Sequence, residues 1–277
     1  MREIWTRLRR DTLALGALAV LALAATAALA GPWLTPYDPV AVDLAVNYQP
    51  GSLAHPLGTD HLGRDTLSRL IAGARVSLGI ALAATASGLA VGGAIGLLAA
   101  WRRGLLERTL LQLVDILLAL PELLLAITAI TILGRGTIST VVAVAVYAVP
   151  SFARIVRAAA QPIVHGEYVV SARASGASDA RVLLFHVLPG CWSPILAHTT
   201  VMLGSAILLA SGLSFLGLGV QPPAAEWGAM LSRGRELLRT APLGAIAPGL
   251  AITATVLGFS VLGDGLRDAA DGRRRGR

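Results

Sequence analysis

Residues Glu167 to Pro189 read EYVVSARASGASDARVLLFHVLP, a polar segment in an otherwise apolar chain. Its first nine residues can form two helical turns, with an acidic residue at the start where a carboxylate suits the helix dipole. Gly176 is suited to end this helix, and Ser178 or Asp179 can cap a second one. The segment therefore predicts a helix, a tight turn and another helix.

The second helix of this segment carries one apolar stripe at helical spacing. We expect the stripe to consist of Ala180, Leu183, Leu184 and Val187, and Pro189 to end the helix. An amphipathic helix of this kind either lies on a lipid surface or belongs to a compact unit that docks on a soluble partner. The glycine break between the two helices favours the docking unit.

The composition outside this segment is that of a membrane protein. The chain has 277 residues, of which 55% are hydrophobic and only 14% charged, and its mean hydropathy is +0.70. Such values indicate a polytopic, all-α membrane protein. The net charge of +7 fits arginines at a membrane edge, so we do not expect nucleic-acid binding.

Six stretches are apolar enough to form transmembrane helices, each of which needs about 20 residues. They are Leu13–Ala30, Val76–Ala100, Thr109–Leu133, Thr137–Phe152, Pro194–Leu218 and Leu243–Leu262. The predicted organisation is an N-terminus (1–12), a first helix (13–30), an extracytoplasmic loop (31–75), a five-helix core (76–262) with a cytoplasmic loop (153–193), and a basic tail (263–277).

The arginines predict the orientation of these spans. With both termini inside, 16 of the 23 basic residues lie on the cytoplasmic side and 7 outside, which follows the positive-inside rule. The loop 153–193 is then cytoplasmic. An alternative for the first span is a signal peptide cleaved after Ala30, although its apolar run exceeds the usual length of about 7–15 residues.

Missing residue types exclude several kinds of chemistry. The chain has no Lys, so it lacks the lysine of a P-loop and cannot form a Schiff base. A single cysteine, Cys191, excludes an internal disulfide and a multi-cysteine metal site. The histidines lack the spacing of a zinc site, and Ser214 misses the nucleophile-elbow pattern. We expect Ser214 to bond a carbonyl of its own helix, and we predict no catalytic residue and no metal site.

Two acidic residues in the third predicted span are functional candidates, because charges inside a membrane are costly. Asp115 and Glu122 are seven residues apart and share a face of a continuous helix, while Pro121 between them favours a kink. They could form an ion relay, as in an ion-coupled secondary transporter, or a structural pair beside a path. An intramembrane enzyme that uses Ser214 is a third hypothesis.

Three glycines in the second span recur at four-residue spacing. Gly88, Gly92 and Gly96 line one helix face, and small residues on such a face let another backbone approach closely. We therefore expect a tightly packed helix pair at this face.

The segment 167–189 resembles the EAA loop of membrane subunits of binding-protein-dependent ABC importers, in particular the second permease of the dipeptide, oligopeptide and nickel type. It departs from the family pattern at Val170 and Ser171, where Glu-Ala is usual, and at Gly190, where Asn is usual. The matching residues are Glu167, Tyr168, Val169, Ala172, Arg173, Ala174, Gly176, Ala177, Ser178, Asp179, His186, Leu188 and Pro189.

Other stretches are similar to the same family and occur in the expected order between residues 55 and 268. They are His55–Asp60 with Leu62–Asp65, Leu113–Asp115 with Leu118–Pro121, Leu213–Pro223 with Trp227–Gly228, and Leu262–Asp268.

The resemblance implies a non-enzymatic transport subunit of the bacterial inner membrane. It would form a heterodimer with a second homologous permease around a path for short peptides, with Asp115 and Glu122 as candidates to line it. Two ABC ATPase subunits would hold ATP and Mg²⁺, so this chain would bind no cofactor, and an extracytoplasmic binding protein would dock on segments 31–75 and 219–242. The matching residues of the EAA loop, Val169 excepted, are the expected ATPase-coupling residues.

Overall fold

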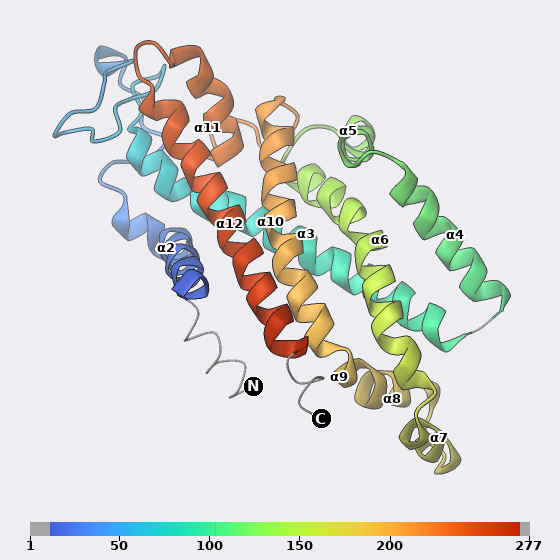
Figure 1. Cartoon of the computed structure of the whole chain (residues 1–277). Helices are drawn as coiled ribbons and strands as arrows, with labels where there is room; N and C mark the ends of the chain where they lie inside the picture. Colours follow the sequence, from blue (N-terminus) through green and yellow to red (C-terminus); the bar gives the residue numbers. More distant parts are fainter. Residues whose placement is uncertain (1–11, 103, 272–277) are drawn as a thin grey trace.

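The computed structural model describes residues 12–102 and 104–271, and this part of the chain is helical and contains no β-strand. Five of its helices are long and apolar enough to cross a membrane, and they form an elongated bundle (Figure 1). This confirms the predicted fold class. The five are α2 (Thr12–Leu34), α3 (Thr66–Trp101), α6 (Thr137–Val164), α10 (Trp192–Phe215) and α12 (Leu243–Asp271).

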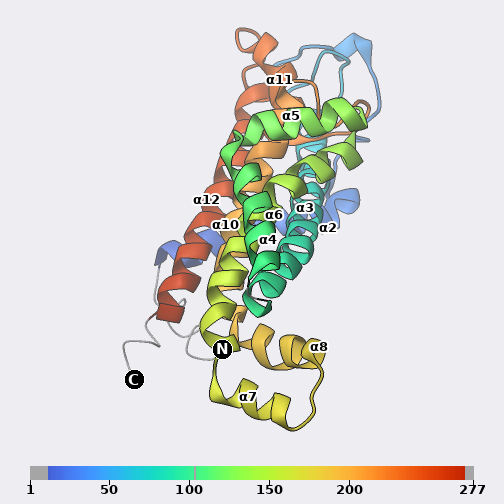
Figure 2. The same ribbon diagram turned by 90° about the vertical axis from the view of Figure 1, so that its right-hand side faces the viewer.

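The third predicted span is broken in two, which corrects the prediction of one helix over Thr109–Leu133. α4 (Leu105–Ala119) and α5 (Glu122–Leu133) meet at an angle of 97°, so α5 lies across the upper end of the bundle in Figure 2. Pro121 disfavours a helical conformation in the residue before it, and Leu120 is extended with φ −86° and ψ 135°. If this bent pair counts as one span, the described helices make six.

Three helices extend well beyond their predicted spans, and one of them, α12, continues past Leu262 to Asp271, into the predicted tail. α3 begins ten residues before Val76, at an N-cap formed by Asp65, whose Oδ2 accepts a hydrogen bond of 2.7 Å from the Ser68 amide. At 1.5 Å per residue α3 is about 54 Å long, more than a hydrocarbon core of about 30 Å. α6 likewise continues past Phe152 to Val164. Hydropathy detects the apolar stretch of a helix, whereas caps decide where the helix ends.

The glycine face of α3 packs against α6, as predicted. A Cβ built on Gly88 would lie 2.5 Å from the Cβ of Ala148, and one built on Gly96 would lie 2.5 Å from the carbonyl oxygen of Ala153. A Cβ built on Gly92 would likewise lie too close to α6, so the absence of a side chain there lets the backbone of α6 approach. The two helices are therefore in backbone contact over two turns.

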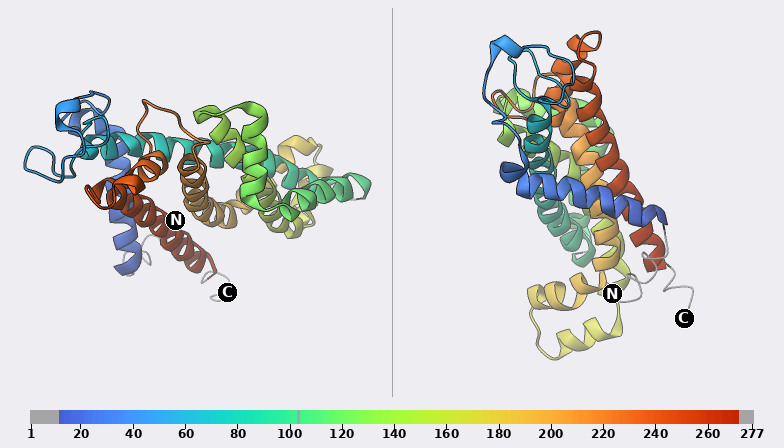
Figure 3. Two further views of the ribbon diagram at one scale, coloured as in Figure 1. Left: turned by 90° about the horizontal axis from the view of Figure 1, so that it is seen from above. Right: turned by 90° about the vertical axis from the view of Figure 1, so that its left-hand side faces the viewer.

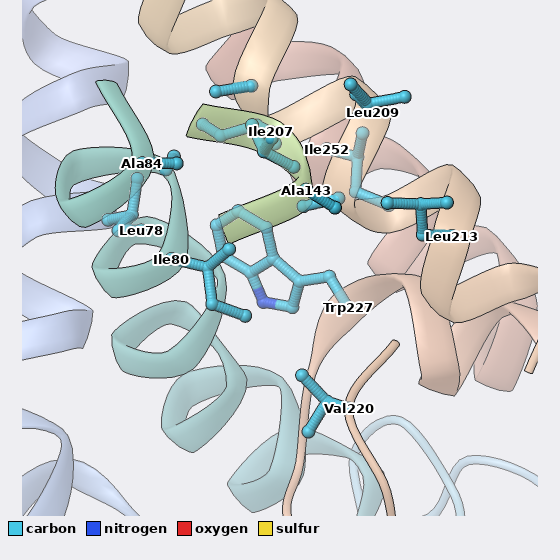
Figure 4. Close-up of a cluster of buried hydrophobic side chains, with 14 of the residues drawn as sticks. Leu78, Ile80, Ala84, Ala143, Ile207, Leu209, Leu213, Val220, Trp227 and Ile252 are labelled. Atoms are coloured by element: carbon cyan, nitrogen blue, oxygen red, sulfur yellow. The ribbon is translucent and has the colours of Figure 1, made fainter. Parts of the chain in front are cut away.

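The largest hydrophobic cluster surrounds the first residue of α11 (Trp227–Gly234). Figure 4 shows the indole of Trp227 next to Ile80 of α3, within a cluster that also contains Leu78 of α3 and Leu213 of α10. The indole nitrogen donates a 2.9 Å hydrogen bond to the carbonyl of Leu70. This cluster ties the short helix α11 to the start of α3.

α2 packs against α3 and α12 and crosses them instead of running alongside, as the right-hand view of Figure 3 shows. Its contact face consists of small residues, with Ala14, Ala17 and Gly31 buried. Residues 1–11 of the predicted N-terminus and the end of the basic tail lie outside the described residues, as does Arg103, so the structure describes only part of the arginine bias.

Candidate functional site

The segment 167–190, here called the α7–α9 unit, projects from one end of the bundle (Figures 1 and 2). α7 (Glu167–Ala174) ends in a Schellman motif. The Gly176 amide donates to the carbonyl of Arg173 at 3.0 Å, and the Ala177 amide donates to that of Ala172 at 3.1 Å. Gly176 has φ +85°, a left-handed conformation that favours glycine. The predicted glycine stop is confirmed.

The second arm begins as predicted but does not end as predicted. The Ser178 hydroxyl accepts a 3.4 Å hydrogen bond from the Arg181 amide at the start of α8 (Asp179–Val182). A π-helical turn, η2 (Leu183–Val187), and a short α9 (Leu188–Gly190) then lead into α10. Pro189 therefore does not end the helix. Because proline cannot donate a hydrogen bond, the chain adopts a wider turn around it instead of stopping.

The π turn also changes which residues of this arm are buried. Val182 and Val187 are buried, whereas Ala180 and Leu184 are exposed. The predicted stripe is therefore wrong at two of its four positions. It assumed 3.6 residues per turn throughout, and a π turn has more, so the apolar face rotates along the helix.

The buried face of the α7–α9 unit packs beneath two long helices. Val169 of α7 and Val182 of α8 form a cluster with Val156 and Ala160 of α6 and with Ala100 at the end of α3. Cys191 is buried in the same cluster. The unit is therefore a packed extension of the bundle.

A charged and aromatic clasp joins this unit to the end of α3. The guanidinium of Arg173 lies 4.9 Å from the ring centroid of Trp101. Asp179 lies between two cations, 3.3 Å from Arg102 and 3.9 Å from Arg173. Exposed pairs of this kind contribute little each, but together they fix the position of both arms against α3. Trp101 and Arg102 were not predicted as site residues.

The predicted coupling residues divide between two faces of the α7–α9 unit. Ala172, Ala177, His186 and Leu188 are partly covered against the bundle, and Arg173 and Asp179 form the clasp. The remaining six predicted residues are exposed: Glu167, Tyr168, Ala174, Gly176, Ser178 and Pro189.

The exposed face of the unit is more apolar than expected. Besides Tyr168 it presents Val170, Leu184 and Phe185, and the Phe185 side chain is 71% exposed. Exposed apolar patches beyond a membrane indicate a partner surface. The sequence contains a signal for the exposure of Leu184 and Phe185. The four consecutive apolar residues 182–185 cannot all lie on one face of a helix, so some of them must be exposed.

The candidate path residues, Asp115 and Glu122, do not share a helix face, because the chain breaks between them. Asp115 on α4 forms a 2.7 Å ion pair with Arg154 of α6, and both side chains are more than half exposed. A second pair joins the same helices, with Glu107 2.5 Å from Arg157. Glu122 begins α5 and lies beside Tyr147 of α6. The structure brings each acid to α6 separately.

Ser214 differs from its predicted role. Its hydroxyl lies at the end of α10 and accepts a 3.3 Å hydrogen bond from the Val220 amide, beyond the helix. The side chain is buried and holds the chain after α10 in place.

At the opposite end of the bundle, the polar residues of segment 55–69 are mostly buried. Arg64, Asp65, Thr66, Ser68 and Arg69 are all inaccessible. Asp65 pairs with His55 at 3.0 Å and caps α3. This stretch therefore packs across the top of the helices.

Asp60 and His61, in the loop before α3, have shifted pKa values. Burial raises the pKa of Asp60, but hydrogen bonds from the Arg64 side chain and from backbone amides outweigh it and hold the pKa below 3.8. Burial lowers the pKa of His61 below 6.5, and repulsion from three nearby arginines lowers it further, against the attraction of Asp60. The surroundings of His61 are therefore rich in positive charge.

A bundle of long apolar helices with a two-helix unit packed beneath it has the architecture of an importer permease. The chain belongs to the family of binding-protein-dependent transport system inner membrane components, whose model matches residues 92–276. Residues 1–50 match the N-terminal transmembrane domain of oligopeptide transport permease C. The protein is therefore a multi-pass inner-membrane permease.

Named relatives cover nearly the whole chain. The glutathione transport system permease protein GsiD of Pectobacterium atrosepticum is 42% identical over an alignment of 277 positions, which covers 98% of this chain and 90% of that protein. The di/tripeptide transport system permease protein DppC of Pseudomonas aeruginosa is also 42% identical, over 98% of this chain and 91% of that protein.

A solved structure has the same fold. A chain of the inward-facing MetNI methionine ABC transporter superposes with a TM-score of 0.59 at 20% identity, over 73% of this chain and 96% of that chain. The likeness shows that the helical core has a permease fold.

Proposed function

We propose that this chain is the second permease of an ATP-driven importer of short peptides. The observation that carries the proposal is the α7–α9 unit, with its packed inner face and its exposed apolar outer face. A rigid unit that is fixed to α3, α6 and α10 can pass a push from a soluble partner to the spans. Peptides are the proposed substrates, because the relatives are named for glutathione and for di- and tripeptides.

The proposed orientation places both termini and the α7–α9 unit in the cytoplasm. The arginine bias supports it, and so does the position of Arg102, Arg154, Arg157 and Arg173 near the unit. The α11 end then faces outward, where an extracytoplasmic binding protein would deliver the substrate.

The proposed partners supply what this chain lacks. A second homologous permease would complete the path, and two ABC ATPase subunits would dock on the α7–α9 unit. ATP and Mg²⁺ would be bound by those subunits, because this chain has no lysine for a P-loop. Its own role is then mechanical, with no catalytic residue.

The experiment that tests this function is purification of the tagged chain from its host's membranes in mild detergent, followed by mass spectrometry of the co-purifying polypeptides. We expect a second six-span permease and a P-loop ATPase, and ATP-dependent uptake of labelled dipeptides by the reconstituted assembly. Uptake that follows an ion gradient and ignores ATP would support the secondary transporter instead.

The structure favours the importer over that alternative at Asp115. Its carboxylate is neutralised by Arg154 at 2.7 Å, whereas an ion relay needs a carboxylate that is free to bind and release its ion. Asp115 and Glu122 remain proposed neighbours of the path. Replacement of Asp115 by Asn should then lower the uptake rate without changing its dependence on ATP.

A further inference from the structure

A small cavity of about 40 Å³ lies at the α11 end, between the loop before α3, the start of α3 and α11. Its charged lining consists of Asp60, His61, Arg64, Arg69 and Arg233. Three guanidiniums therefore surround the cavity with one carboxylate. Buried charges need compensation, so this imbalance requires a physical explanation.

The single carboxylate of the cavity is shared by two arginines. Oδ2 of Asp60 lies 2.7 Å from Nε of Arg64 and 3.6 Å from Nε of Arg69. Nη2 of Arg64 approaches the same oxygen at 2.6 Å, but it is buried and forms no aligned hydrogen bond within the described part of the chain. The side chains of Arg64 and Arg69 are only 3% and 5% exposed. Asp60 is therefore fully engaged.

The third guanidinium, that of Arg233, has no carboxylate partner among the described residues. The two other buried carboxylates at this end are already used. Asp65 is bonded to His55 and to Ser68, and Glu226 accepts hydrogen bonds from the amides at the start of α11. The chain therefore has positive charge in excess at this cavity.

We propose that the cavity is a carboxylate-binding site in which Arg233, with Arg64 beside it, receives one carboxylate group from outside the chain. A guanidinium matches the two oxygens of a carboxylate. A water needs roughly 10–15 Å³ of such volume, so the cavity has room for one small group and excludes a whole peptide.

Arg233 is the residue that contacts the incoming carboxylate, because its side chain is partly accessible while Arg64 and Arg69 are covered. It lies in the last turn of α11, whose first turn is fixed by the buried carboxylate of Glu226 and by Trp227. A binding group on a fixed helix loses little freedom when its ligand arrives. The cavity is therefore organised before the carboxylate enters.

Two sources can supply this carboxylate, and both rest on the proposed function and orientation. One is an acidic side chain of the extracytoplasmic binding protein, and the other is the C-terminal carboxylate of a peptide. The chemistry of the site is the same in both cases.

The first test measures binding of acetate to the purified full chain. Thermal unfolding is followed as sodium acetate replaces sodium methanesulfonate at constant ionic strength, for the wild type, Arg233→Gln and Arg235→Gln. Arg235 is the matched control, because it lies two residues away and stacks at 5.0 Å on the ring of Phe215. We expect acetate to stabilise the wild type and Arg235→Gln. In Arg233→Gln the apparent affinity should fall at least about tenfold.

An equal response of the wild type and Arg233→Gln, or no response of the wild type, would overturn the proposal. Acetate binding by this chain does not depend on ATPases or on uptake. If no ATPase co-purified, the proposed function would fail and the acetate result would still be readable.

The second test identifies the source in the assembled importer. If the source is the binding protein, Arg233→Gln weakens its affinity for the assembly at least about tenfold in the absence of peptide. If the source is the peptide, Arg233→Gln leaves the affinity of the binding protein for the assembly unchanged. The importer then loses its preference for transporting a dipeptide over the C-terminal amide of that dipeptide. If Arg233→Gln changes neither the binding-protein affinity nor the dipeptide preference, a role of the site in transport is overturned.

Discussion

At the scale of single residues, Gly176 shows most directly how the backbone conformation of one residue shapes the α7–α9 unit. Its φ of +85° closes the turn between the two arms, and a side chain added there would meet no atom within 4 Å. The requirement for glycine is therefore one of backbone conformation and not of space.

We predict that Gly176→Arg abolishes uptake while the protein remains in the membrane. A non-glycine residue in the left-handed region costs about 1–2 kcal/mol, and the arginine adds a bulky charge at the exposed turn. Gly176→Asn is the control, because asparagine tolerates this conformation, and it should retain most uptake. The measurement is peptide uptake normalised to the amount of inserted protein, and normal uptake by Gly176→Arg would contradict the prediction.

A second prediction at this scale concerns the pH dependence of His61. Its pKa in the folded protein lies below 6.5, so the folded state binds fewer protons than the unfolded state as the pH falls below about 6.5. Stability that is present above this pH is therefore lost as the pH falls through the folded pKa. Asp60 stays charged in this window, because its pKa lies below 3.8.

The measurement is the thermal midpoint of the purified chain between pH 7.5 and 5.5. Between these pH values the thermal midpoint of His61→Gln should fall less than that of the wild type. The midpoint of the control His165→Gln, at the other end of the bundle, should fall as much as that of the wild type. Parallel loss in all three proteins would show that His61 does not contribute.

At the scale of helices, α3 is the element that both ends of the molecule share. Its last residue, Trp101, holds Arg173 of the α7–α9 unit, and its first turns carry the buried network around Asp65 and Ser77. Between these ends, the glycine face lies against the backbone of α6. We therefore expect a displacement of the unit to be passed to the α11 end through this one helix.

We predict that Gly92→Ala destabilises the α3–α6 contact by about 1–3 kcal/mol, the usual cost of overpacking a close contact. Its new Cβ would lie 2.9 Å from the Cβ of Phe152 and 3.1 Å from the amide nitrogen of Ala153. Gly79→Ala on the same helix is the control, because nothing lies within 4 Å of its Cβ. Thermal unfolding of both variants measures the difference, and equal midpoints would argue against a tight contact.

At the scale of the whole molecule, the two ends of the bundle, at α7 and at α11, each carry a packed polar or amphipathic unit. The spans between them have large exposed apolar surfaces. The α7 end presents Leu184 and Phe185 to the surroundings, and the α11 end has the cationic cavity. Each end is packed firmly onto the bundle, so the proposed partners would act on the same set of helices from either end.

We predict that the double replacement Leu184→Glu and Phe185→Glu prevents the ATPase from co-purifying. Both side chains are exposed, so the fold should survive, but two carboxylates cannot enter an apolar groove without a large desolvation cost. Gln161→Glu, which adds charge at an exposed position of α6, is the control. Unchanged recovery of the ATPase with the double variant would exclude this surface as the docking site.

The sequence alone determined the class of fold, the family resemblance and most of the α7–α9 unit. Apolar runs locate spans because the bilayer requires them, and the Gly176 turn and the Ser178 cap are local signals that need no tertiary context. The glycine face of the second span was also readable, because its spacing matches a helix.

Only the tertiary structure decided which residues meet. The π turn before Pro189 and the 97° break before Glu122 depend on how the chain packs around each proline. The ion pair of Asp115 with Arg154 joins residues 39 positions apart, and the cavity around Arg233 joins the loop before α3 to α11. A periodic pattern reports the face of one helix, whereas contacts between helices depend on their packing in space.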